Sequence, residues 1–258
     1  MVTTPKVTLT TSDWFAIAAI VEGNNIADFG WPNGKPVVFR FGWKSPAGTY
    51  CFSIRNNAVD RSYVAPFTIA AGQANTDQEI VVAVPAPPSG TWLSDTGAGL
   101  VLYWTLANHS SFGLADNLAN TWQSANKIST VSQTNGVATV SNTFELFDVG
   151  LYRDPDGTGL PPLFEVPNLS DELRRCQRYY QKRTLTSRGT LSSTSATQRH
   201  WNFILPCRMR VVPTVTATLT VGSFTGTDTT EEMLSGYSDP ANTTTIAVMS
   251  AHTLNARI

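Results

Sequence analysis

The chain has 258 residues, of which 41% are hydrophobic and only 14% are charged, and its formal net charge is -1. This composition excludes intrinsic disorder, collagen and coiled coil, because apolar side chains suffice to bury a core while charges are too few for long solvated helices. A surface built from 34 Thr and 21 Ser against 5 Lys favours strands over helices.

Alternating apolar and polar residues predict antiparallel strands in the first two thirds of the chain. In the stretch 37–44 every second residue is apolar, which places Trp43 on a buried face. The same alternation places Trp104 in the core, and it recurs in four further stretches: 50–54, 80–84, 100–106 and 144–152. Turn residues bound these stretches and no helix separates them, so the pattern predicts an all-β, antiparallel sandwich.

The next segment is predicted to end this sandwich and to begin a helix. Two glycines and three prolines in 154–162 cannot continue a sheet. Asn168 is suited to cap a helix over 168–182, with Asp171 and Glu172 in its first turn. We therefore expect a sandwich, a linking helix and a C-terminal β domain, with these bounds: 1–166, 167–184 and 185–258.

One apolar stripe is predicted on that helix. Spacings of four, three and four residues place its members on one side: Leu169, Leu173, Cys176 and Tyr180. A helix of fewer than five turns with one narrow stripe is not stable alone in water. The stripe therefore predicts packing, and we expect it to join copies of the chain.

Strand patterns return after the helix, in 201–205, 214–221, 244–249 and 253–257. They predict a small second β-sandwich of roughly 75 residues, a size at which folding alone is marginal. An oligomer would relieve this.

The segment 168–182 also carries a resemblance to a known family. Its residues Glu172 to Lys182 resemble the Glu-Leu-x-x-Cys-Gln-Arg-Tyr-Tyr-x-Lys signature of many tailed-phage and prophage fibre or appendage proteins. Segments on both sides are similar to the same family, upstream to its sandwich resembling a carbohydrate-binding module, and downstream to its terminal β domain: 15–30, 61–63, 90–100, 144–151 and 205–215.

The resemblance implies a jelly-roll sandwich and a structural protein of a phage or phage-like particle, as a tail fibre, head fibre or spike. It implies a homotrimer, attached to other virion proteins and assembled in the bacterial cytoplasm, that binds bacterial cell-surface polysaccharide for host adhesion. The alternative is a structural connector of the particle that binds no glycan.

Three tryptophans beside turn residues are candidates for sugar contact. Trp31, Trp92 and Trp122 lie where a ring could be exposed, with Asp95 and Asn126 nearby as hydrogen-bonding groups. The competing interpretation is that a tryptophan plugs the end of the sandwich, which is the commoner arrangement.

Nine basic and no acidic residues lie in 174–210. Arginines there could bind phosphates or an anionic polysaccharide, or pair with acids of neighbouring subunits, or simply face solvent. The pI of about 6.3 argues against a nucleic-acid partner.

Catalytic and metal-binding motifs are not found in the sequence. His109, His200 and His252 are isolated, and the three cysteines lack a metal-ligand spacing. A tight turn is the expected structure of 154–157, although its two Asp residues leave a calcium loop as an alternative. No stretch has the ~20 apolar residues of a membrane span. We expect no enzyme activity, no cofactor, no metal and no membrane insertion, although a carboxylate pair of glycosidase type stays open.

Overall fold

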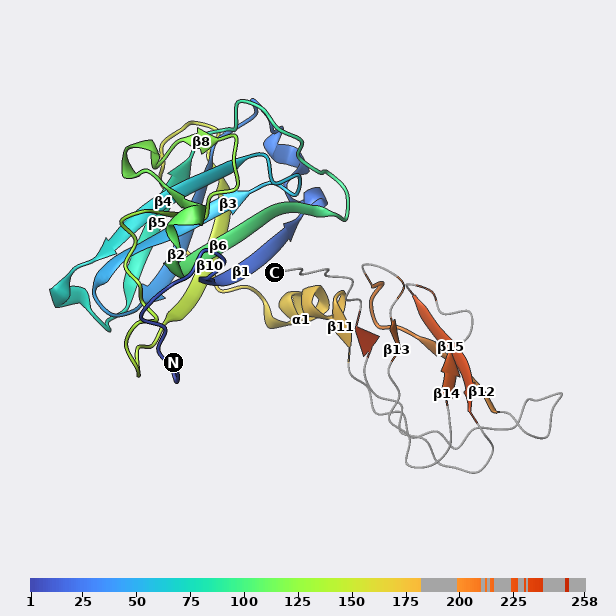
Figure 1. Ribbon diagram of the computed structural model, residues 1–258. Helices are drawn as coiled ribbons and strands as arrows, with labels where there is room; N and C mark the ends of the chain where they lie inside the picture. The colour runs from blue at the N-terminus through green and yellow to red at the C-terminus, as the bar shows by residue number, and fades with distance from the viewer. Residues whose placement is uncertain are drawn as a thin grey trace. The chain divides into compact units, whose positions relative to one another are not determined.

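The computed structural model describes residues 1–181, 199–209, 212, 214–215, 224–226, 230, 232–238 and 249–250. The chain divides into two compact units, Met1–Phe164 and Glu165–Ile258 (Figure 1). Strands dominate the described residues of both units, which contain one α-helix. The predicted all-β class with a single helix is therefore confirmed.

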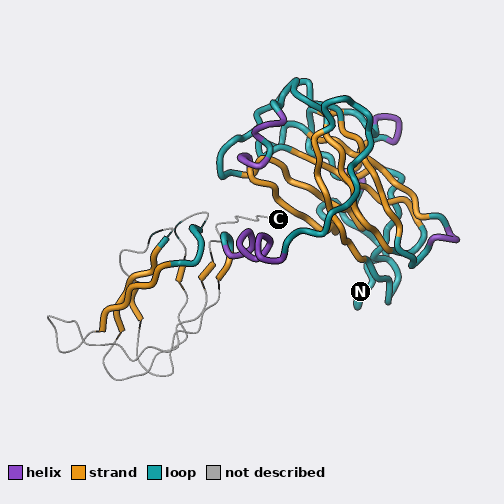
Figure 2. Tube along the Cα trace, turned by 180° about the vertical axis from the view of Figure 1, so that it is seen from behind, coloured by secondary structure: helices purple, strands orange, loops and turns teal. Residues whose placement is uncertain are grey.

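Two antiparallel sheets form the sandwich of the first unit. The larger has the strand order β1-β6-β3-β4-β8 and the smaller has the order β10-β2-β5. The strands of the larger sheet are β1 (Trp14–Glu22), β6 (Ala98–Asn108), β3 (Gly48–Arg55), β4 (Ser62–Ile69) and β8 (Trp122–Gln123). Those of the smaller sheet are β10 (Glu145–Arg153), β2 (Val37–Lys44) and β5 (Gln78–Val84). Figure 2 shows short helical turns and loops gathered at the ends of the strands.

An aromatic core joins the two sheets face to face. The ring centroid of Phe39 on β2 lies 4.8 Å from that of Phe52 on β3, and that of Phe41 lies 5.7 Å from that of Trp104 on β6. Trp43 and Trp104 are only 0% and 1% exposed, so their predicted place in the core is confirmed. Each such side chain contributes about 1.5–3 kcal/mol by leaving water.

Connecting segments cover the outer face of the larger sheet. They contain η4 (Ser110–Phe112), η5 (Asp116–Leu118) and the parallel pair β7 (Gly113–Leu114) and β9 (Ser129–Thr130). Here Cys51 of β3 and Val64 of β4 pack against Leu114 of β7. Burial raises the pKa of the Cys51 thiol to about 11, so this cysteine stays protonated and unreactive at neutral pH.

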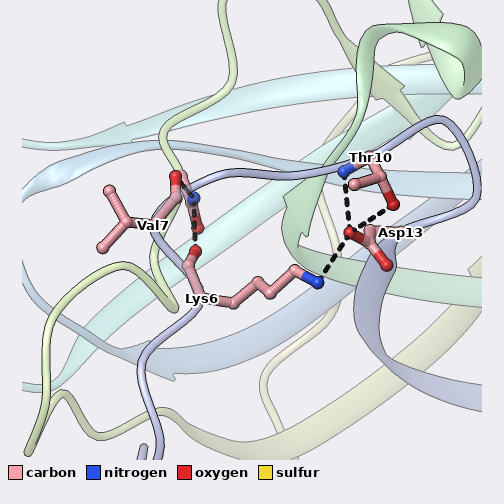
Figure 3. A network of polar contacts seen from close by, with 5 residues as sticks. Lys6, Val7, Thr10 and Asp13 are labelled. Atoms are coloured by element: carbon pink, nitrogen blue, oxygen red, sulfur yellow. Dashed lines mark hydrogen bonds and ion pairs between the residues drawn. The ribbon is translucent and has the colours of Figure 1, made fainter.

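The N-terminal segment is fastened to the sandwich by a polar network (Figure 3). The Asn135 side chain donates to the carbonyls of Lys6 and Val7, at 2.9 and 3.1 Å. Asp13 accepts from the backbone N–H of Thr10 at 2.7 Å and pairs with the Lys6 ammonium at 3.2 Å. The hydrogen bonds from Thr10 and then Lys6 lower the pKa of Asp13, so its carboxylate stays charged.

A tight turn follows β10. The buried Asp154 carboxylate accepts from the backbone N–H groups of Thr158 and Gly159, at 2.9 and 2.7 Å. Gly157 and Gly159 have φ values of +66° and +67°, which suit glycine. Both oxygens of the carboxylate thus accept hydrogen bonds from the backbone of the turn.

The helix α1 (Leu169–Gln177) is shorter than predicted. Its start is confirmed, because the Asn168 side chain accepts from the backbone N–H of Ser170 at 2.9 Å. Its predicted continuation is wrong: Tyr180 and Gln181 form β11, paired with β16 (Met249–Ser250). Lys182, the predicted last residue, lies outside the described residues.

Two three-stranded sheets are described in the second unit, in the orders β11-β16-β13 and β12-β15-β14. Their other strands are β13 (Thr214–Val215), β12 (Arg199–Ile204), β15 (Met233–Ser238) and β14 (Phe224–Gly226). The predicted strand residues 216–221, 244–248 and 253–257 lie outside the described residues.

Candidate functional site

Three tryptophans from distant parts of the sequence meet at one end of the sandwich. The ring centroid of Trp31 lies 4.8 Å from that of Trp92 and 5.6 Å from that of Trp122, and the last two lie 5.5 Å apart. The ring planes cross at 77–84°, an edge-to-face arrangement that aromatic quadrupoles favour. The three loop tryptophans predicted from the sequence therefore form one tryptophan cluster.

Strand registers bring these loops together. Trp31 precedes β2, whose first residue Val37 pairs with Val84, the last residue of β5. Trp92 lies between β5 and β6, and Trp122 begins β8, which pairs with the start of β4. All three rings thus belong to the same end of the two sheets.

Exposure differs within the tryptophan cluster. Trp31 is 9% exposed and lies deepest, whereas Trp92 and Trp122 are half-buried. Phe29 packs on Trp31 and Tyr63 packs on Trp122, with ring centroids 5.6 and 5.4 Å apart. Trp31 is therefore buried and fills the end of the sandwich. Trp92 and Trp122 expose part of their indole surface to solvent.

Each indole N–H of the cluster donates to a nearby backbone carbonyl. The acceptors are the carbonyls of Lys35 at 2.7 Å, Ser89 at 3.4 Å and Pro85 at 2.8 Å, for Trp31, Trp92 and Trp122 respectively. These bonds fix the ring orientations. A ligand would therefore meet the apolar ring surfaces of the indoles.

Asn56 holds the neighbouring turn in place. Its buried amide donates to the carbonyl of Thr91 at 3.1 Å and to the carboxylate of Asp60 at 2.6 Å. Its amide oxygen accepts from the backbone N–H groups of Asp60 and Arg61, at 3.2 and 3.1 Å. The turn between β3 and β4 is thereby fixed beside Trp92.

Arg61 supplies a charged group next to the indoles. Its guanidinium donates to the Ser89 hydroxyl through Nε at 2.9 Å and through a terminal nitrogen at 2.5 Å. A Cβ on Gly90 would lie 2.7 Å from Arg61 Cγ and 3.1 Å from Trp92 Nε1, so glycine allows this close approach. The sequence pattern did not single out Arg61, Asn56 or this glycine as site residues, since their contacts join separate loops.

The two predicted polar partners are less closely tied to the cluster. Asp95 is exposed, and its carboxylate accepts from the backbone N–H of Gly97 at 2.8 Å. Asn126 is exposed in the loop that follows β8. A ligand role for these two residues stays a prediction, as it does for the tryptophans.

The predicted helix stripe is exposed on α1. Leu169 and Leu173 are 82% and 54% exposed, and Cys176 is exposed as well. Tyr180, the fourth predicted member, belongs to β11 and not to the helix, because strand pairing with β16 replaces the helical turn there. The stripe on the helix itself thus has three members.

Exposed apolar residues also lie in the non-helical chain that precedes α1. Leu160, Leu163 and Val166 are 75%, 87% and 85% exposed, and Leu169 follows at the same spacing of three residues. We call the set Leu160, Leu163, Val166, Leu169 and Leu173 the apolar segment.

Part of the basic run is described. Arg175 forms an ion pair with Glu172 of the same helix, at 2.9 Å. Lys182, Arg183, Arg188 and Arg210 lie outside the described residues.

Neither a cluster of candidate metal ligands nor a helix that could span a membrane is found in the described part of the chain. No group of three or more His, Cys, Asp or Glu side chains there is arranged to hold a metal ion. None of its helices is long and apolar enough to cross a membrane.

Comparison with known proteins gives no further assignment. No protein-family model, curated protein or solved structure matches the chain.

Proposed function

We propose that the chain is an adhesive appendage protein of a phage or phage-like particle, whose first unit binds bacterial cell-surface polysaccharide. The observation that carries the proposal is the tryptophan cluster. Three rings that are 61 and 30 positions apart in the sequence, from 31 to 92 and from 92 to 122, meet at one end of the sandwich.

The chemistry of this end suits a sugar. The half-buried surfaces of Trp92 and Trp122 offer apolar area to sugar C–H groups, since their N–H groups are already bonded. Arg61 lies near Trp92, and the exposed Asp60 precedes it in the same turn, so this end of the sandwich has a donor and an acceptor for hydroxyls. The rings are locked by packing, so little side-chain entropy is lost on binding. The proposed chemistry is binding without turnover.

The appendage role rests on the family resemblance of 168–182 and on the apolar segment. The apolar segment has five exposed large apolar side chains within 14 residues of sequence, and exposed apolar surface is typical of protein–protein interfaces. We infer that the apolar segment joins copies of the chain, in the homotrimer that the resemblance implies.

An array of bacterial polysaccharides, probed with the full chain, tests the proposal. We expect binding to a subset of the array, and at least about tenfold weaker binding for Trp92→Ala and for Trp122→Ala. Trp14→Ala is the matched control, because Trp14, on β1, is also half-buried but packs on Tyr103 of β6 and not on the tryptophan cluster. Wild-type affinity in both cluster variants would overturn the assignment.

The second candidate is a structural connector without glycan binding, which the exposure of the apolar segment also favours. Adsorption of purified full chain to host cells separates the two. A connector would neither adsorb to the cells nor bind the array, yet it would still associate through the apolar segment.

A further inference from the structure

The surface of the first unit is hollowed at the far end of β2 from the tryptophan cluster. A groove of about 570 Å³ opens there, lined by Lys44, Asp77, Phe144, Glu145, Leu146 and Phe147. The groove is shallow and open to solvent, so a ligand would lie along its surface and keep part of its hydration. Seven steps of ~3.3 Å along β2 separate Val37, at the cluster end, from Lys44, which gives a distance of roughly 23 Å.

Opposite charges lie side by side in the groove. The Lys44 ammonium lies 3.6 Å from a carboxylate oxygen of Asp77 and 3.6 Å from one of Glu145. These separations exceed the ~2.7–3.2 Å of a hydrogen bond. The ammonium protons and carboxylate oxygens therefore attract one another and still have the capacity to hydrogen-bond a ligand.

An aromatic ring adjoins these charges. Phe147 pairs with Gly42 in the register of β10 on β2, and its ring fills the space that a side chain at position 42 would need. The ring is half-buried, so part of its surface reaches the groove. Gly42 is therefore required for the ring to lie against the strand.

The charge pattern selects the class of ligand. The two carboxylates of Asp77 and Glu145 and the one ammonium of Lys44 leave the lining with a net charge of -1, which disfavours an anion, while the ammonium beside both carboxylates weakens their attraction for a cation. The hydroxyls of a neutral polyol can donate to the carboxylates and accept a hydrogen bond from the ammonium, so such a ligand can use both kinds of group. A sugar also has an apolar C–H face that packs on a ring such as that of Phe147.

We propose that this groove is a second carbohydrate-binding site, which takes neutral sugar residues. The inference goes beyond the proposed function, since that function uses only the tryptophan cluster. Glu145→Gln and Asp77→Asn keep the shape of each side chain but remove its charge, and Gly42→Ala displaces the Phe147 ring. We expect each to weaken binding of a neutral sugar at the groove by about tenfold.

The test measures affinity and hydrogen exchange of the full chain with short malto-, cello-, chito- and galacto-oligosaccharides. A neutral oligosaccharide is expected to bind and to protect the amides of 144–147 from exchange. Phe147→Ala serves as a second variant that removes the ring. Asp156→Asn is the matched control, because Asp156 is exposed in the turn after β10 and should leave affinity unchanged.

The outcomes separate this inference from the proposed function. In one outcome the sugar protects only the amides of Trp92 and Trp122, and the groove variants keep wild-type affinity. That result overturns the assignment of the groove as a sugar site and leaves the proposed function intact. Protection of 144–147 that persists in Trp92→Ala and Trp122→Ala supports the groove even where the cluster fails. Binding of glucuronate oligomers or spermidine alone, or of no compound, overturns the groove.

Discussion

Apolar side chains have opposite environments in two regions of this chain. Between the sheets of the first unit, Phe41 and Trp104 are 0% and 1% exposed, whereas in the apolar segment Leu163 and Leu169 are 87% and 82% exposed. Burial in the core stabilises the fold of the chain itself. The exposed leucines contribute no such stability to a lone chain, and their burial can instead drive association.

The largest expected effect comes from the core. Trp104→Ala should lower the free energy of unfolding by about 3–5 kcal/mol, because it leaves a cavity among Phe41, Phe52 and their neighbours. Chemical denaturation of the full chain measures it. Val140→Ala, at a residue that is 54% exposed, should change stability by less than about 0.5 kcal/mol. Equal effects of the two substitutions would remove the contrast between the regions.

Substitutions in the apolar segment should weaken self-association of the chain and should not change its folding stability. Leu169→Ser should weaken self-association by about tenfold or more, since burying a leucine contributes about 1.5–3 kcal/mol. Its effect on the unfolding of the first unit should be negligible. Analytical ultracentrifugation across micromolar concentrations measures self-association, and calorimetry measures the unfolding of the first unit.

Leu118→Ser is the matched control for that prediction. Leu118 is 42% exposed but lies on η5 of the first unit, so its replacement should leave association unchanged. A wild-type chain that stays monomeric at these concentrations would contradict an association role for the apolar segment.

The sequence predicted the core better than the site. Core positions follow from a pattern within one strand, whereas the site is formed by residues that are far apart in the sequence. Alternation along 37–44 is local, and it placed Trp43 correctly. The tryptophan cluster depends on strand registers across the sheets, which no local pattern encodes. The end of α1 was mispredicted for the same reason, since Tyr180 pairs with a strand near position 250.

The burial of the tryptophan cluster is intermediate between that of the core and that of the apolar segment. A substitution at Gly90 tests whether the cluster contributes to both stability and binding. The φ of Gly90 is +114°, and a Cβ there would crowd Arg61 Cγ at 2.7 Å. Gly90→Ala should therefore lower the free energy of unfolding by roughly 1–3 kcal/mol and should also displace Arg61 from Trp92. Denaturation measures the first effect, and polysaccharide binding measures the second. Gly72→Ala, where a Cβ meets open space, is the control.

The smallest effect concerns the turn through which the chain leaves the first unit. The hydrogen bond from the Gly159 N–H, followed by those from Thr158, lowers the pKa of Asp154 from its ordinary value of 3.8, against the opposing effect of burial. Its stabilising contribution is therefore complete above that value and is lost as the pH falls through the lowered folded pKa.

Thermal unfolding of the full chain between about pH 6 and pH 2 measures this loss. Asp154→Asn should be less stable than wild type at the upper end of the range and should converge with it at the lower end, because the wild-type carboxyl is then protonated. Asp156→Asn should keep the wild-type pH dependence, since Asp156 is exposed in the same turn. If the curves of wild type and Asp154→Asn stay parallel, the carboxylate is not what holds the turn, and the exit of the chain toward the apolar segment depends on its glycines instead.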